Sequence, residues 1–200
     1  MPILGIIASA ISGNLFTSSV SYDSIATTTV GSGGVSSITF SSIPATYTHL
    51  QIRFIGRSNV PSNYSQSTAI RFNSDTGANY SRHYLIGYTG GYTADASGGD
   101  ASETKISLSS GLSGNNWSAQ MAGAGIIDIL DYRNTNKYKT VKCLAGADGN
   151  SAATLISTMA LSSGSWMSTS AITSITVANA NNTYNLEEYS SFALYGIKGA

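Results

Sequence analysis

The stretch HLQIRFIGR, residues 49–57, decides the fold class. Leu50, Ile52 and Phe54 fall on one side of an extended chain, and the polar residues between them fall on the other. Successive side chains of a β-strand point to opposite faces, so this alternation predicts a strand with one buried face.

The same alternation recurs along the whole chain. It is found in ITF (38–40), AIRFN (69–73), TKISLS (104–109), KTVKCLA (139–145) and ITSITV (172–177). Clusters of Gly, Asn and Asp separate these segments and supply the backbone conformations that chain reversals need. No convincing amphipathic helix intervenes. Nine or ten such strands predict an all-β fold, a single antiparallel β-sandwich with jelly-roll or related Greek-key connections.

Two segments depart from the alternating pattern. GIIDILDY, residues 125–132, carries apolar side chains on both faces, which predicts a central strand covered on both sides. GYTGGYTADASGGDAS, residues 87–102, has almost no aliphatic content and predicts a long exposed loop.

Composition excludes some classes of function. The 200 residues fit one large domain, or a domain with an arm, and only 10% of them are charged, against about 25% in typical proteins. Hydroxyl and amide groups are therefore expected to keep the surface hydrated. The net charge is zero and the basic residues are scattered, which excludes the electrostatic footprint of a nucleic-acid-binding protein.

No catalytic motif is present, and we predict a protein that is not an enzyme and has no cofactor or metal. A GxSxG motif is missing, and the only histidines are His49 and His83. NSDTG, residues 73–77, has oxygen ligands at alternate positions as calcium loops do, but it lacks the downstream glutamate, so we interpret it as a side-chain-stabilised turn. The single cysteine, Cys143, has no partner for an intramolecular disulfide and is predicted to be a small buried apolar residue.

The opening stretch MPILGIIASAISGNLF, residues 1–16, is apolar without being a typical leader. A secretory signal needs a positive charge ahead of its apolar run, and here the first Lys or Arg is Arg53. The run is also too short to predict a membrane span. Three interpretations remain: a retained arm or edge strand, an ordinary first core strand, and a processed leader.

We favour the arm, and divide the chain into a docking arm (residues 1–20) and a β-sandwich domain (residues 21–200). Burying its apolar side chains would contribute about 8–15 kcal/mol, whereas ordering the backbone costs about 1–2 kcal/mol per residue. The arm therefore also needs backbone pairing, with a sheet edge or with another chain. The predicted docking residues are Ile3, Leu4, Ile6, Ile7 and Leu15.

Aromatic residues offer a second kind of candidate site. The chain has 12 tyrosines, and four of them lie within residues 80–92. Aromatic rings on glycine-rich segments can stack on sugars, and Tyr88, Tyr92 and Trp117 are the candidates for binding a glycan. Two alternatives are a role in a protein interface and simple packing at the sheet margins.

Four segments together resemble a known group of proteins. They are MPILGIIAS (1–9), TYTHLQIRFIGRS (46–58) with FNSDTGANYSRHYL (72–85), DILDYRNTNKYKTVK (128–142) and SSFALYGIKGA (190–200). In this order they resemble small structural proteins of tailed bacteriophages, especially those that infect cyanobacteria and other aquatic bacteria. The resemblance spans nearly the whole chain and carries no catalytic motif.

The resemblance implies a virion protein with a β-sandwich, forming homotrimers or other symmetric homo-oligomers. The first expectation is a capsid decoration (cement) protein that docks on neighbouring subunits, such as the major capsid protein, through its arm. The alternative is a tail fibre or receptor-binding protein, which would contact other tail proteins and recognise host surface glycans.

Overall fold

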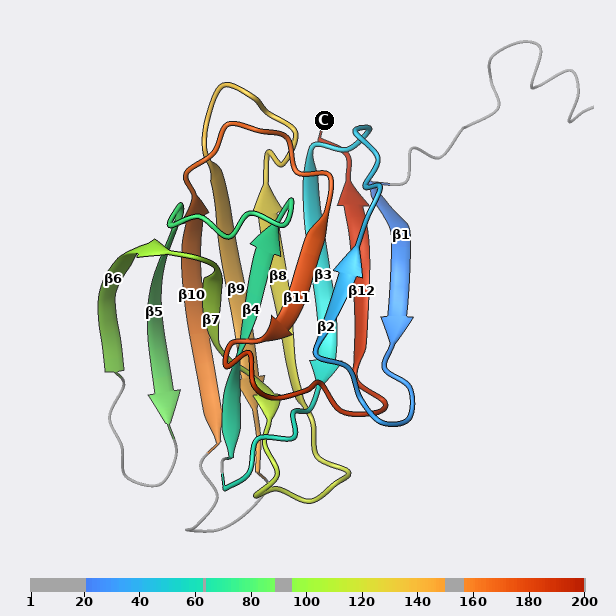
Figure 1. The fold of residues 1–200 in the computed structure, drawn as a ribbon, viewed down its shortest axis with the longest axis vertical. Helices are drawn as coiled ribbons and strands as arrows, with labels where there is room; N and C mark the ends of the chain where they lie inside the picture. Colours follow the sequence, from blue (N-terminus) through green and yellow to red (C-terminus); the bar gives the residue numbers. More distant parts are fainter. Residues whose placement is uncertain (1–20, 63, 89–94, 150–156, 200) are drawn as a thin grey trace, which may run out of the picture.

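The computed structural model describes residues 21–62, 64–88, 95–149 and 157–199. The predicted arm, residues 1–20, lies outside them. The described residues form an all-β fold, as predicted, in which the ladders between strands are antiparallel (Figure 1). The strands are β1 (Tyr22–Thr29), β2 (Ser37–Phe40), β3 (His49–Gly56), β4 (Ser65–Phe72), β5 (Tyr80–Tyr88), β6 (Asp95–Glu103), β7 (Ile106–Ser113), β8 (Gly123–Leu130), β9 (Lys139–Ala147), β10 (Thr158–Trp166), β11 (Ile175–Asn179) and β12 (Ser191–Ile197).

The strands form two sheets that pack as a sandwich. The large sheet has the order β1-β12-β3-β8-β9-β10-β5-β6, and the small sheet has the order β2-β11-β4-β7. Eight strands make a jelly roll: β1, β12, β3 and β8 belong to the large sheet, and β2, β11, β4 and β7 form the small one. Successive members of this set lie in different sheets, except for β4 and β7, which are neighbours in the small sheet, and this is the double-sheet arrangement of that fold.

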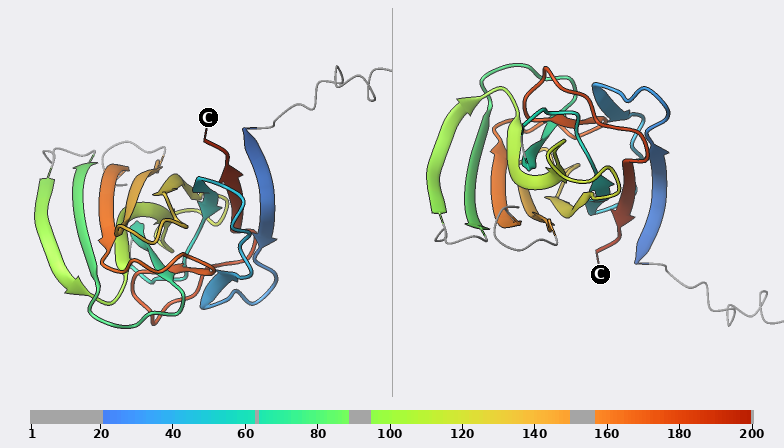
Figure 2. Two further views of the ribbon diagram at one scale, coloured as in Figure 1. Left: turned by 90° about the horizontal axis from the view of Figure 1, so that it is seen from above. Right: turned by 90° about the horizontal axis from the view of Figure 1, so that it is seen from below.

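Two insertions widen the large sheet. β5 and β6 are inserted between β4 and β7, and β9 and β10 between β8 and β11. All four add to the same side of β8, so β1 and β6 lie at opposite ends of one long sheet (Figure 2). The insertions therefore create a broad surface that an eight-stranded jelly roll would not have.

The core lies between the sheets and is built from the predicted alternation. The inward residues of β3, Leu50, Ile52 and Phe54, are buried, which confirms the prediction for that strand. The Phe54 ring stacks on Phe192, and it also fills the space beside Gly125. A Cβ atom at Gly125 would lie 2.6 Å from the Phe54 ring, so the ring requires a glycine at this position.

The prediction for residues 125–132 is partly wrong. β8 is central in the large sheet, as expected, and Ile127 and Ile129 are buried against the core. Ile126, however, is on the outer face and exposed. The small sheet covers only one face of the large sheet. The apolar residues on the other face of β8 are therefore not covered by the described part of the fold.

The prediction of an exposed loop over residues 87–102 is wrong at both ends. β5 continues through Tyr88, and β6 pairs with β5 in an antiparallel ladder with two register shifts. A strand at the edge of a sheet is held by backbone hydrogen bonds to one neighbour, so it needs little aliphatic content. The low aliphatic content was therefore no evidence against a strand.

Residues 73–77 form a turn, as predicted. Asp75 accepts a hydrogen bond from the Gly77 amide (2.8 Å), and its other carboxylate oxygen accepts from Asn79 (2.9 Å) and from the Trp166 indole (2.7 Å). These donors stabilise the ionised carboxylate and lower the pKa of Asp75, with the Asn79 bond contributing most. The carboxylate thus links this turn to the end of β10.

Cys143 is buried on the inner side of β9, which confirms that prediction. Burial raises the pKa of its thiol to about 12, and the reactive species is the thiolate. We expect an aromatic disulfide reagent to react at least about 100-fold more slowly with the folded protein than with protein unfolded in guanidinium chloride. Release of the coloured thiol measures both rates, and similar rates would contradict the buried position.

Candidate functional site

The outer face of the large sheet carries a continuous row of apolar side chains. Ile126 on β8, Leu144 on β9, Leu161 on β10 and Leu85 on β5 lie directly opposite one another in the registers of three successive ladders. Residues of adjacent strands in such positions contact one another side by side. The row therefore crosses four strands as one ridge.

None of the described residues covers this ridge. The exposed fractions are 39% for Ile126, 55% for Leu144, 55% for Leu161, 51% for Leu85, and for two residues beside the row 50% for Ile55 and 66% for Met159. Six large side chains exposed to this extent present roughly 500 Å² of apolar surface. A contiguous patch of this size is comparable to the largest apolar patch of a typical monomeric protein, and such patches are often functional.

Small residues make a hollow on one side of the ridge. Ala124, Gly146 and Gly87 occupy the next register level on β8, β9 and β5, and Met159 stands among them on β10. The hollow around these residues has a volume of about 650 Å³ and extends to Tyr88. The long Met159 side chain therefore projects beside a hollow that is large enough to hold a side chain from another molecule.

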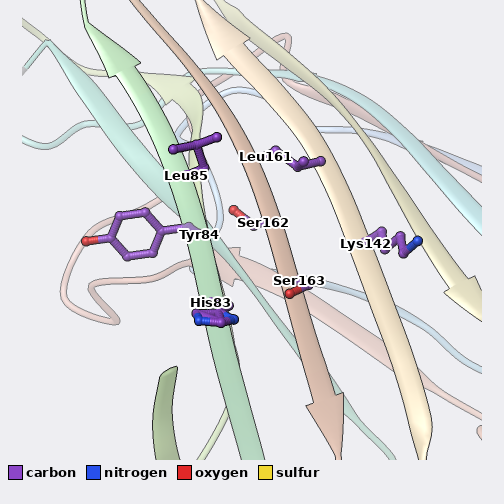
Figure 3. A pocket seen from close by; sticks show the side chains of 7 residues that line it. All are labelled: His83, Tyr84, Leu85, Lys142, Leu161, Ser162 and Ser163. Atoms are coloured by element: carbon purple, nitrogen blue, oxygen red, sulfur yellow. The ribbon is translucent and has the colours of Figure 1, made fainter. Parts of the chain in front are cut away.

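Polar residues border the ridge on the other side. Asp128, Lys142, Ser163 and His83 form that register level on β8, β9, β10 and β5. A second hollow of about 380 Å³ lies over β9, β10 and β5 at this border. Figure 3 shows its lining, with His83 beside Ser163 and, one level along, Leu85 near Leu161.

The remaining part of the outer face is occupied by its own side chains. The Arg53 guanidinium lies 5.4 Å from the centre of the Tyr22 ring and 5.5 Å from that of the Tyr195 ring. Gln51 accepts a hydrogen bond from Arg53 (2.8 Å) and donates one to Asp128 (2.7 Å). These contacts satisfy the face over β1, β12 and the first part of β3, so the uncovered apolar surface begins at Ile55 near the end of β3 and continues onto β8.

Most of the predicted docking and glycan residues belong to parts of the chain that the structure does not describe. Tyr92 lies outside the described residues, as do the five predicted docking residues, Ile3, Leu4, Ile6, Ile7 and Leu15. Tyr88 ends β5 and lines the hollow beside Met159. Trp117 is only 3% exposed, so its ring has no free face for a sugar. That correction has a physical cause, since the segment between β7 and β8 folds back onto the domain and buries the indole.

The apolar row was missed by sequence reasoning, although one signal pointed to it. The apolar residues on both sides of residues 125–132 included Ile126, but they were interpreted as covered within the fold. Leu144 and Leu161 lie in strands whose outward positions also carry ordinary polar residues. Whether a leucine in a strand is buried or exposed depends on whether another layer of the fold covers its face of the sheet, and the local sequence does not show this.

The described residues offer little for other kinds of site. They contain no group of three or more His, Cys, Asp or Glu residues placed to hold a metal ion. Within the same residues, no helix has the length and apolar character that crossing a bilayer requires. His49 accepts a hydrogen bond from the Asp131 amide (3.0 Å), which ties the start of β3 to the end of β8.

No protein-family model matches this chain, and no curated protein matches it. The uncovered sheet face is thus the feature on which a functional proposal can be built.

Proposed function

We propose that this protein is a non-enzymatic structural component of a virion, a capsid decoration or cement protein that docks on neighbouring subunits. Its partners would be the major capsid protein and other copies of itself in a symmetric homo-oligomer, such as a homotrimer. The N-terminal arm, with Ile3, Leu4, Ile6, Ile7 and Leu15, would supply one contact.

The uncovered apolar face carries this proposal. An apolar patch of about 500 Å² is often functional, and burial against a neighbouring subunit would remove its leucine, isoleucine and methionine side chains from water. The jelly roll adds support by analogy alone, because viral capsid domains use it and so do lectins. The chain has no net charge and many hydroxyl groups. Both properties are compatible with a protein that is packed closely among other proteins on a particle surface.

Location and copy number in the particle test the proposal. A reconstruction of the particle, with quantitative mass spectrometry of its proteins, should place hundreds of copies of the chain on the capsid. A few copies at the tail would support the tail alternative instead. Absence from purified particles would overturn both.

Deleting residues 1–15 should abolish incorporation into the particle while leaving the sandwich folded. In this proposal the arm buries its apolar side chains and pairs its backbone on a neighbouring subunit, so its loss removes that contact. Mass spectrometry of particles made with the truncated protein measures incorporation, and circular dichroism of the purified truncated protein measures folding. Normal incorporation would contradict the docking role of the arm.

A tail fibre or receptor-binding protein is the second candidate, and Tyr88 beside the hollow of β8, β9 and β10 favours it. An aromatic ring next to a hollow bordered by Asp148, Ser157 and Thr158 has the composition of a sugar site. A glycan array tests this, with Tyr88→Ala and Tyr92→Ala as variants. Reproducible binding that either substitution removes would support the receptor role, and a blank array would count against it.

A further inference from the structure

We propose that two copies of this chain pack face to face through the apolar row, about a two-fold axis that runs along the strands between β9 and β10. The inference rests on the described sheet and not on the virion role. It goes beyond the arm contact by assigning a second surface and its occupant.

The size of the patch fits a second copy. A standard protein interface buries about 800 Å² on each partner, with an apolar centre and a polar rim. The six exposed side chains supply more than half of that area. The adjoining rows of small and polar residues supply the rest, and two sheets whose strands run nearly parallel can stack at about 10 Å.

A symmetric dimer needs a two-fold axis that lies in the plane between the two faces. An axis along the strands, midway between β9 and β10, places β9 of one copy over β10 of the other and β8 over β5. Each register level then faces the same level of the second copy. Leu144 meets Leu161, and Ile126 meets Leu85, so the two ridges pack apolar on apolar.

The same axis also places the row of small residues against its counterpart in the second copy, and the row of polar residues against its counterpart. Met159 of each copy lies over Gly146 of the other, so the most exposed side chain of the patch enters the hollow that a residue without a side chain provides. On the polar side, Asp128 lies over His83 of the second copy. The fit therefore combines shape at one level with facing hydrogen-bonding groups at the other.

The other in-plane axis, perpendicular to the strands, is disfavoured. It would invert the levels and place Met159 and its neighbours against the level of Lys142 and Asp128. A charged group that loses water without gaining a partner raises the free energy of the complex, so this packing would weaken association. The arrangement along the strands instead keeps Lys142 and Asp128 against the polar level of the second copy, where Ser163 and His83 offer hydrogen-bonding partners.

Analytical ultracentrifugation of the full-length chain tests the proposal. The wild-type protein should sediment as a dimer at micromolar concentration. Leu144→Glu and Leu161→Glu should each raise the dimer dissociation constant at least about 100-fold, because each substitution puts two carboxylates into the centre of the symmetric interface. Val35→Glu is the matched control: Val35 is also exposed, but it pairs with Leu186 away from the row, and the dimer should persist.

A second set of variants tests the axis. His83→Asp should weaken the dimer about tenfold, since it faces Asp128 of the second copy, and adding Asp128→His should restore part of the loss. Circular dichroism and thermal unfolding establish that every variant is folded. A full-length variant with Ile3→Glu and Ile7→Glu separates the arm from the sheet and should remain dimeric.

Three results would overturn the proposal. They are a wild-type chain that is monomeric at about 100 µM, an oligomer that both glutamate variants on the row leave intact, and an oligomer that the arm variant dissociates as fully as the row variants do. The last result would identify the arm as the occupant of the row. A dimer that fails to reach the particle would count against the virion role and leave the face-to-face contact standing.

Discussion

Replacing Arg57 by methionine will lower the free energy of unfolding by about 3–5 kcal/mol. Arg57 follows β3, and its side chain is almost entirely buried. Its Nε donates to the Glu187 carboxylate at 2.5 Å, and its two terminal nitrogens donate to the carbonyls of Ser118 (2.8 Å), Trp117 (3.1 Å) and Met121 (3.2 Å). One guanidinium thus holds the connection between β7 and β8 against the segment that precedes β12.

The size of the effect follows from what the substitution leaves behind. A methionine fills most of the volume, but the partly buried Glu187 carboxylate loses its cationic partner, and the carbonyl groups lose their donor. Arg57→Lys should recover only part of the stability, because an ammonium cannot donate in several directions in one plane.

Urea unfolding followed by circular dichroism measures the change. Arg71→Met is the control, since Arg71 makes one exposed hydrogen bond to the Thr104 carbonyl, and it should cost no more than about 1 kcal/mol. Equal effects of the two methionine substitutions would contradict the assigned role of Arg57.

Raising the pH from 10 to 12 will remove up to about 2.7 kcal/mol of stability through Tyr80 alone. Tyr80 is fully buried beside the rings of Phe72 and Trp166. Its single hydroxyl hydrogen is shared between the carbonyls of Phe72 (3.3 Å) and Asp75 (3.2 Å), and its oxygen accepts from the Phe72 amide (3.2 Å). Burial is the main cause that raises the pKa of Tyr80 to about 12, from the ordinary value of 10.0.

The sign follows from proton binding. In the folded protein the phenol keeps its proton up to about pH 12, whereas in the unfolded chain it loses that proton near pH 10. The folded state therefore binds more protons between these values. The contribution of Tyr80 is fully present below pH 10 and is lost as the pH rises to about 12.

Tyr80→Phe isolates this contribution. The variant should be less stable than wild type by about 1–2 kcal/mol at pH 8, because the hydroxyl bonds are lost. The difference should vanish and then reverse as the pH approaches 12, and other groups that titrate there, such as Cys143, cancel because both proteins contain them. Urea unfolding at several pH values measures the difference, and a difference that does not change with pH would contradict the prediction.

Local patterns carried most of the prediction of the fold. Alternation identified β2, β3, β4, β7, β9 and β11, because the period of two is a property of each strand by itself, and the apolar run of residues 125–132 identified β8. The same reasoning did not identify β1, β5, β6, β10 or β12. β6 has almost no aliphatic residues, and the backbone of β5 holds it instead. β10 contains the run LSSG, residues 161–164, whose serines and glycine resemble a turn.

The buried hydroxyl groups are a second feature that amino-acid composition could not predict. Abundant serine predicted a hydrated surface, yet some of these hydroxyls lie between the sheets. Ser110 and Thr158 are bonded at 2.5 Å, and Ser162 accepts a hydrogen bond from the Ser109 amide at 3.0 Å. Hydrogen bonds lower the cost of burying these four residues, and their partners lie on distant strands, so a linear chain does not show them.

The sequence by itself determined that the chain makes strands, where most of them lie, and that the strands form an antiparallel sandwich. Only the tertiary structure decided which strands widen the large sheet and which face of that sheet stays uncovered. The physical reason is that alternation assigns each side chain to one of two faces, whereas the covering of a face depends on layers contributed by residues far away in the chain. Ile127 and Ile126 are chemically identical neighbours, and the small sheet covers one of them and leaves the other exposed.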